Sequence, residues 1–108
     1  MKIDVLIVKP NEEPKQEKLN NTLEAFQNVV GGWIQIVRPF KDKSIGLVCN
    51  EEGKILNLPP NRRIQEDIIA GTFVLVGLAM GEDGEDFTSL TIEQLIQMYI
   101  MFELSTVD

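Results

Sequence analysis

Short apolar runs separated by glycine and proline fill residues 31–77, and this pattern restricts the fold more than any other feature of the chain. The runs at 33–37, 45–49, 55–58 and 72–76 are rich in β-branched residues, and each has the length of a β-strand. Gly31-Gly32, Pro39 and Gly71 lie at their ends. Because a tight turn with Gly53 separates the second run from the third, these two are expected to form an antiparallel hairpin. This part of the chain is therefore expected to form a small sheet.

Two amphipathic helices are expected, one toward each end of the chain. The first begins near Pro14 and ends at Gly31-Gly32, with an apolar face of Leu19, Leu23, Phe26 and Val30. The second begins at Thr91, since Gln94 three residues later completes a capping box. Its expected core face is Ile92, Leu95, Ile96, Tyr99 and Phe102 or Glu103.

These elements predict a single α+β domain over residues 1–108. Its sheet is mainly antiparallel with about four to five strands, which include an N-terminal strand at 2–8 and a short returning strand at 87–89. Both helices, the N-terminal and the C-terminal one, are expected to cover the same face of this sheet. Residues 72–76 are apolar on both sides and the last helix contains methionines, which favours either a second chain on the other face or a strongly curled sheet. We predict a homodimer.

The residue types exclude several classes of site chemistry. The chain has one cysteine, Cys49, and no histidine, so it has neither a Cys-His or Ser-His pair nor a standard zinc site. Cys49 alternates with Ile45 and Leu47 and is expected in the core. We expect a protein that is not an enzyme and has no cofactor or metal. With no signal peptide, membrane span or disulfide pair in the sequence, we expect a cytoplasmic location without membrane contact.

Charge is divided unevenly along the chain. Residues 1–63 hold all ten Lys and Arg and eight acids, for a net charge of +2, while residues 64–108 hold nine acids and no base, for −9. Nucleic-acid phosphates repel such a segment, so direct binding of nucleic acid is not expected. Two interpretations remain, either a solvated acidic surface or an acidic face that binds a basic protein partner.

Two polar turns are the candidate binding sites. Asn61, Arg62 and Arg63 follow the rigid Pro59-Pro60 corner, where two guanidinium groups can offer bidentate donors to a phosphate or carboxylate. Asn50 and Glu51 lie in the turn before Gly53. The alternative is that one arginine pairs with a nearby acid and fixes the loop; the acids in question are Glu51, Glu52, Glu66 and Asp67.

The motifs Asn-Glu-Glu-Gly at 50–53 and Pro-Asn-Arg at 60–62 carry a resemblance to a family. Over about residues 29–104 the chain resembles small domains of unknown function that bacteria, their phages and conjugative elements carry. The recurring positions are Asn50, Glu51, Gly53, Asn61 and Arg62. The resemblance implies a bacterial accessory protein of a phage or other mobile element, without a known activity or ligand.

The leading functional hypothesis is a non-enzymatic binding or regulatory protein, associated with a phage or mobile element, that acts through protein-protein contact. A small-ligand-binding protein is the alternative, in which Arg62, Arg63 and the Asn50-Glu51 turn hold a phosphorylated metabolite or a nucleotide signal. An enzyme ranks third, because only carboxylates, Lys, Arg and one Tyr remain as catalytic groups.

Overall fold

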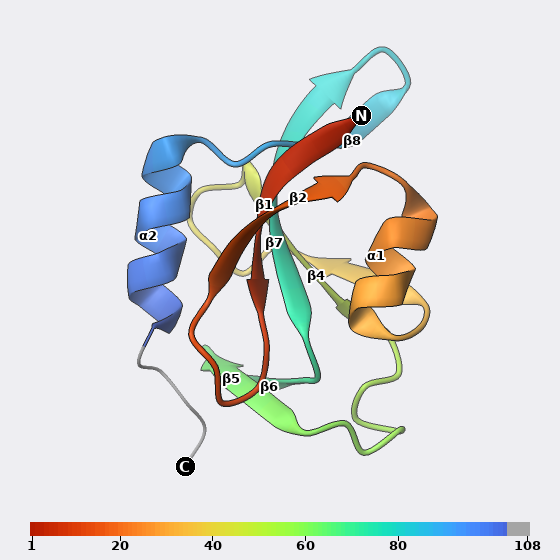
Figure 1. Ribbon diagram of the computed structural model, residues 1–108, viewed down its shortest axis with the longest axis vertical. Coiled ribbons are helices and arrows are strands. Elements are labelled where there is room, and N and C mark those ends of the chain that lie inside the picture. Colours follow the sequence, from red (N-terminus) through yellow and green to blue (C-terminus); the bar gives the residue numbers. More distant parts are fainter. Residues whose placement is uncertain (104–108) are drawn as a thin grey trace.

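The computed structural model describes residues 1–103 and shows an α+β fold (Figure 1). In chain order the elements are β1 (Lys2–Val8), β2 (Lys15–Asn20), α1 (Leu23–Val30), β3 (Ile34–Val37), β4 (Ile45–Asn50), β5 (Pro60–Ile64), β6 (Asp67–Ala70), β7 (Phe73–Gly81), β8 (Gly84–Thr88) and α2 (Ile92–Phe102). The expected fold class is confirmed. The expected four to five strands are too few, because residues 1–103 contain eight.

One large sheet forms the centre of the fold, and all its pairings are antiparallel. Its order is β2-β1-β7-β4-β3, and β8 pairs with the far end of β7. The other two strands, β5 and β6, form a separate hairpin. The charged strand β2 and the uncharged strand β3 are therefore the first and last strands of this order.

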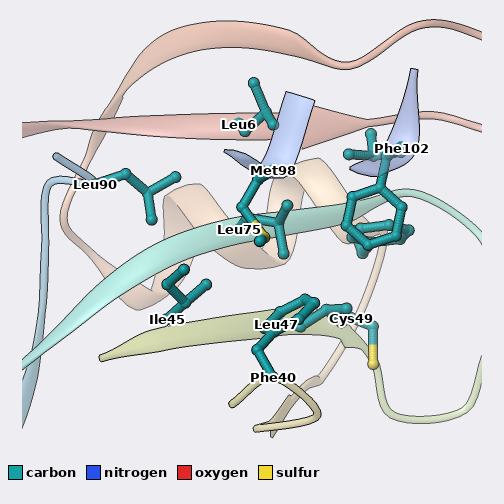
Figure 2. Close-up of a cluster of buried hydrophobic side chains, with 11 residues drawn as sticks. Leu6, Phe40, Ile45, Leu47, Cys49, Leu75, Leu90, Met98 and Phe102 are labelled. Atoms are coloured by element: carbon teal, nitrogen blue, oxygen red, sulfur yellow. The ribbon is translucent and has the colours of Figure 1, made fainter. Parts of the chain in front are cut away.

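The two helices pack on opposite faces of the large sheet (Figure 1). Met98 and Phe102 of α2 belong to one buried cluster, drawn in Figure 2, while Phe26 and Val30 of α1 belong to the other. The expectation that both helices cover one face is wrong. Since alternate side chains of a strand face opposite sides, β7 is apolar on both sides because each helix covers one of them. The apolar character of β7 therefore gives no argument for a second chain.

The first helix is shorter than expected because residues 15–20 form a strand. β2 pairs with β1 along its whole length, and a helix there would leave this edge of β1 unpaired. α1 begins after Thr22, whose Oγ1 accepts a hydrogen bond from the Ala25 N–H at 3.2 Å. It ends, as expected, at Gly31, which has a φ of 82°.

The expected hairpin between residues 45–49 and 55–58 is wrong as well. β4 pairs with β3 on one edge and with β7 on the other, so it has no edge left for another strand. Residues 51–57 form a turn instead, and Ile55 lies exposed in it. The hairpin that does form joins β5 to β6, with Gln65 at a φ of 57° in its turn.

The start of α2 is confirmed, but part of its expected core face is wrong. Thr91 and Gln94 form the capping box. Met98 and Phe102 are the buried side chains of the helix, and the sheet contacts it on this side. Ile92 and Ile96, which were expected in the core, are exposed instead. No helix within residues 1–103 is long and apolar enough to cross a membrane.

Candidate functional site

Asn61 and Arg62 both point into the protein, because β5 has an irregular register. Consecutive side chains of a regular strand face opposite sides. The register of the β5–β6 pairing shifts between Pro60 and Arg62, which marks a β-bulge. A bulge changes the direction in which a side chain points. Asn61 and Arg62 are both buried, whereas the next residue, Arg63, is exposed. The side chains of Asn61 and Arg62 therefore point inward and that of Arg63 points outward, so the three do not form one binding site.

The Asn61 side chain connects β5 to two other segments. Its Nδ2 donates hydrogen bonds to the carbonyl of Val8 at 2.8 Å and to the carbonyl of Gly71 at 2.9 Å. Its Oδ1 accepts a hydrogen bond from Nη1 of Arg62 at 2.9 Å. Asn61 therefore holds the end of β1 and the start of β7 against β5, and it orients the guanidinium beside it.

Arg62 caps the C-terminal end of α2. Its Nε and Nη2 donate to the carbonyl of Phe102 at 3.1 and 3.0 Å, and Nη2 also donates to the carbonyl of Glu12 at 2.6 Å. Phe102 is the last residue of α2, and carbonyls at this end of a helix lack helical donors and carry partial negative charge. The guanidinium supplies both the donors and the positive charge.

The charge of Arg62 is buried, and no carboxylate within residues 1–103 pairs with it. Its side chain is 0% exposed, and burial lowers the pKa of the guanidinium, which stays charged because arginine starts from so high a value. Within residues 1–103 neither Arg62 nor Arg63 forms an ion pair, and Asp67 pairs with Lys54 instead. The expected pairing with a neighbouring acid is therefore wrong for this part of the chain. A ligand has no access to the Arg62 guanidinium in this conformation.

The Asn50-Glu51 turn borders a different cleft. Asn50 is buried, with Nδ2 donating to the carbonyl of Val30 at 3.1 Å and Oδ1 accepting from the Glu52 N–H at 2.8 Å. The Asn50 side chain thus connects the end of α1 to the turn. Glu51 is exposed at the edge of a cleft of about 160 Å³.

Cys49 and Asp67 also line this cleft, but they do not make a reactive pair. Cys49 is buried, as expected. Burial, and to a smaller extent the negative charge of Asp67, raises the pKa of its thiol, so the thiolate is disfavoured. Within residues 1–103 there is also no group of three or more acids or cysteines that is suited to hold a metal ion.

Arg63 lies at a larger and more apolar groove between β5, the loop at 39–42 and α2. The groove has a volume of about 760 Å³. Its apolar lining comes from Phe40, Ile64, Met98 and Met101. Of the five residues predicted as a site, Arg63 alone borders this groove, Asn50 and Glu51 border the cleft, and Asn61 and Arg62 are buried between elements.

The outer face of α2 carries an exposed apolar stripe that includes Ile92 and Ile96, two residues expected in the core. Ile92, Ile96 and Ile100 follow one another at four-residue spacing and are 76%, 54% and 62% exposed. The exposed Met101 links this face to the groove. The signal was present in the sequence, since a helix that is apolar on nearly all sides has more apolar surface than one sheet can cover.

The acids of the C-terminal half do not gather on one face. Residues 82–86 form the tip of the β7–β8 hairpin, while Glu66 in the β5–β6 turn and Asp67 at the start of β6 lie at the opposite end of the molecule (Figure 1). Glu85 at the tip pairs with Arg38. The last acid, Asp108, lies outside the described residues. These acids are therefore divided between two ends of the molecule.

Comparison with known proteins places the chain in a family. The family model described as Domain of unknown function (DUF3846) matches residues 1–103. The chain belongs to this family. The DUF3846 match includes β1, β2 and α1, so it reaches further than the resemblance expected over about residues 29–104. No curated protein and no solved structure matches the chain.

Proposed function

We propose that the chain is a non-enzymatic binding protein that acts through protein-protein contact, with the outer face of α2 as its contact surface. The observation that carries this proposal is the exposed stripe of Ile92, Ile96 and Ile100. Contiguous exposed apolar surface of this kind marks interaction sites in soluble proteins. A helix with such a stripe fits an apolar groove or a helix of another protein.

Both ends of α2 are fixed, which supports this role. The capping box holds the first turn, and the guanidinium of Arg62 holds the carbonyl of Phe102 at the last. A helix held in this way loses little further freedom when a partner binds, so more of the contact energy remains as affinity. The buried arginine thus has a functional consequence without touching the partner.

The partner that fits best has apolar side chains at its centre and basic residues around them. Met98 and Met101 border the groove beside the stripe, and methionine adapts to side chains of different shapes. Glu93 lies in the first turn of α2 and places negative charge beside the stripe. Opposite charge at the rim of a contact favours fast and specific association. The family resemblance supports a regulatory target of a bacterial host or of a mobile element.

Photo-crosslinking tests this proposal in cells that naturally contain the protein. A photoreactive amino acid is placed at Ile96, and separately at Glu17 of β2 as a control on another surface. Position 96 is expected to capture a defined protein that position 17 does not capture. Equal products at both positions, or none at position 96, would contradict an α2 contact surface.

Small-ligand binding is the second candidate, and the groove at Arg63 favours it. Ligand pockets are mostly apolar with a few polar groups, and this groove combines an apolar lining with one guanidinium at its edge. A phosphorylated metabolite or nucleotide signal at a hundredfold its dissociation constant stabilises the folded protein by about 2.7 kcal/mol. A thermal-shift screen detects this gain, which Arg63→Ala is expected to remove and Lys9→Ala to leave. A flat screen would contradict this candidate.

A further inference from the structure

The outer edge of β3 has backbone groups that no described residue pairs with. On its inner side the Trp33 carbonyl accepts a hydrogen bond from the Glu51 N–H at 2.8 Å, and β3 then pairs with β4 to Val37. Backbone groups of a strand alternate in direction. Gln35 and Val37 therefore direct their N–H and C=O groups toward β4, and Ile34 and Ile36 direct theirs outward.

The two outer strands of the large sheet differ in how they are protected. β2 contains Lys15, Glu17 and Lys18, and charged residues discourage pairing with another strand. β3 reads Ile-Gln-Ile-Val, and residues 28–37 contain no charge. The exposed side chain of Trp33, at 66%, stands directly before β3. The β3 edge therefore has the properties of a strand-pairing surface, and the β2 edge does not.

We propose that β3 pairs with β3 of a second copy of this chain, antiparallel, about a two-fold axis at Gln35. In this register Ile34 lies opposite Ile36 of the second copy, and the two exchange both of their outward backbone hydrogen bonds. The two-fold axis generates the same pair of hydrogen bonds between Ile36 and Ile34 of the second copy. The two large sheets therefore join into one continuous sheet. This contact uses neither the α2 face nor the groove, so it stands independently of the proposed function.

The side chains near the axis fit this arrangement. The register sets Trp33 opposite Val37 of the second copy, on the face of the sheet that α2 covers, and the contact covers exposed indole surface. Gln35 meets its own copy on the same face, where two amides can exchange hydrogen bonds. No two like charges are brought opposite each other.

Arg38 provides complementary charge at each end of the contact. A hollow of about 370 Å³ lies at the C-terminal end of α1, lined by Gln27, Asn28, Gly31, Gly32 and Trp33. The last turn of α1 has no basic residue. The register sets Arg38 of the second copy opposite Gly32, where its guanidinium meets the negative end of the helix. Arg38 would leave its exposed pair with Glu85, and such pairs contribute little to stability.

Disulfide trapping tests the register directly. Gln35 meets its own copy as a non-hydrogen-bonded pair, with Cα atoms about 4.5 Å apart, which a disulfide spans. Gln35→Cys is made in a Cys49→Ala background, because Cys49 lies opposite Gln35 on β4 within the same chain. Copper-phenanthroline oxidation is expected to give a covalent dimer. Gln16→Cys on β2, in the same background, is expected to give no covalent dimer.

Sedimentation analysis over a range of concentrations tests the charge contact. Arg38→Glu is expected to weaken the dimer about tenfold or more, because it sets a negative charge against the end of α1. Lys9→Glu changes the net charge equally and is expected to leave the dimer unchanged. A protein that stays monomeric at every concentration would overturn the proposal. So would a dimer that Gln35→Cys fails to trap, since its interface would lie elsewhere.

Discussion

Replacement of Arg62 by alanine is expected to be among the most destabilising exchanges of a charged residue in this protein. The change removes the donors to the carbonyls of Phe102 and Glu12 and to Oδ1 of Asn61. Water can reach the exposed Glu12, while Phe102 and Asn61 are buried. Two buried acceptors without donors, at about 1–3 kcal/mol each, give a loss of about 2–6 kcal/mol in the free energy of unfolding. A domain of this size has about 5–15 kcal/mol in total.

Urea unfolding followed by far-UV circular dichroism measures this loss. Arg63→Ala is the matched control, because it removes the same side chain from the next residue, which is exposed, and is expected to stay within about 0.5 kcal/mol of wild type. The stability of Arg62→Lys is expected to fall between those of the two alanine variants. A single ammonium group cannot donate to all the acceptors that the planar guanidinium reaches.

A loss below about 1 kcal/mol in the free energy of unfolding of Arg62→Ala would refute the reasoning. Two buried acceptors without donors are expected to cost more than this, even at the lowest cost for each. Equal losses for Arg62→Ala and Arg63→Ala would refute it too, since the argument depends on the burial of one and the exposure of the other.

Two further predictions concern Cys49 and Gly71. The thiol of Cys49 has a raised pKa in the folded state, so its stabilising contribution is fully present below the unfolded pKa near 9 and is lost as the pH rises through the folded pKa. The free energy of unfolding, measured from pH 7 to 10.5, should therefore decrease more steeply with pH for wild type than for Cys49→Ala. The same pH dependence for both proteins would contradict this. Gly71 has a φ of 84°, and a Cβ there would lie 2.7 Å from Cδ1 of Leu58. Gly71→Ala is expected to cost about 1–3 kcal/mol, mainly because of the positive φ. The cost should be somewhat larger than for Gly31→Ala, where φ is 82° but the space is open, because the end of the Leu58 side chain must shift. Equal losses in urea unfolding would exclude the clash.

The elements that local sequence determines were predictable. The capping box of α2 and the glycine at the end of α1 depend on residues within one or two turns of each other. The continuous apolar run of β7 also indicated a strand buried on both sides. What covers those sides depends on tertiary packing, which the sequence pattern does not encode. The order of strands therefore had to come from the structure.

β2 shows how a tertiary pairing overrides a local pattern. Leu19 continued the apolar spacing of Leu23 and Phe26 in a way that is typical of a helix. In the structure Leu19 belongs to a strand, because pairing with β1 satisfies more backbone groups than an added helical turn would.

The sequence did not indicate the structural role of Asn61 and Arg62. The sequence singled out Asn61 and Arg62 as unusual, and both are indeed in special positions. Their partners lie far away in the sequence, since Phe102 is 40 residues from Arg62. A register shift in β5 decides which side chains turn inward, and periodic patterns do not show such shifts.

The affinity of the crosslinked partner for two single variants tests the proposed contact surface most directly. Ile96→Asp changes the α2 face, and Leu23→Asp makes the same kind of change on α1, with side chains that are 54% and 56% exposed in the wild type. Calorimetry with the purified partner is expected to show about tenfold or more weaker binding for Ile96→Asp and unchanged binding for Leu23→Asp. Equal affinities of both variants and wild type would contradict the account.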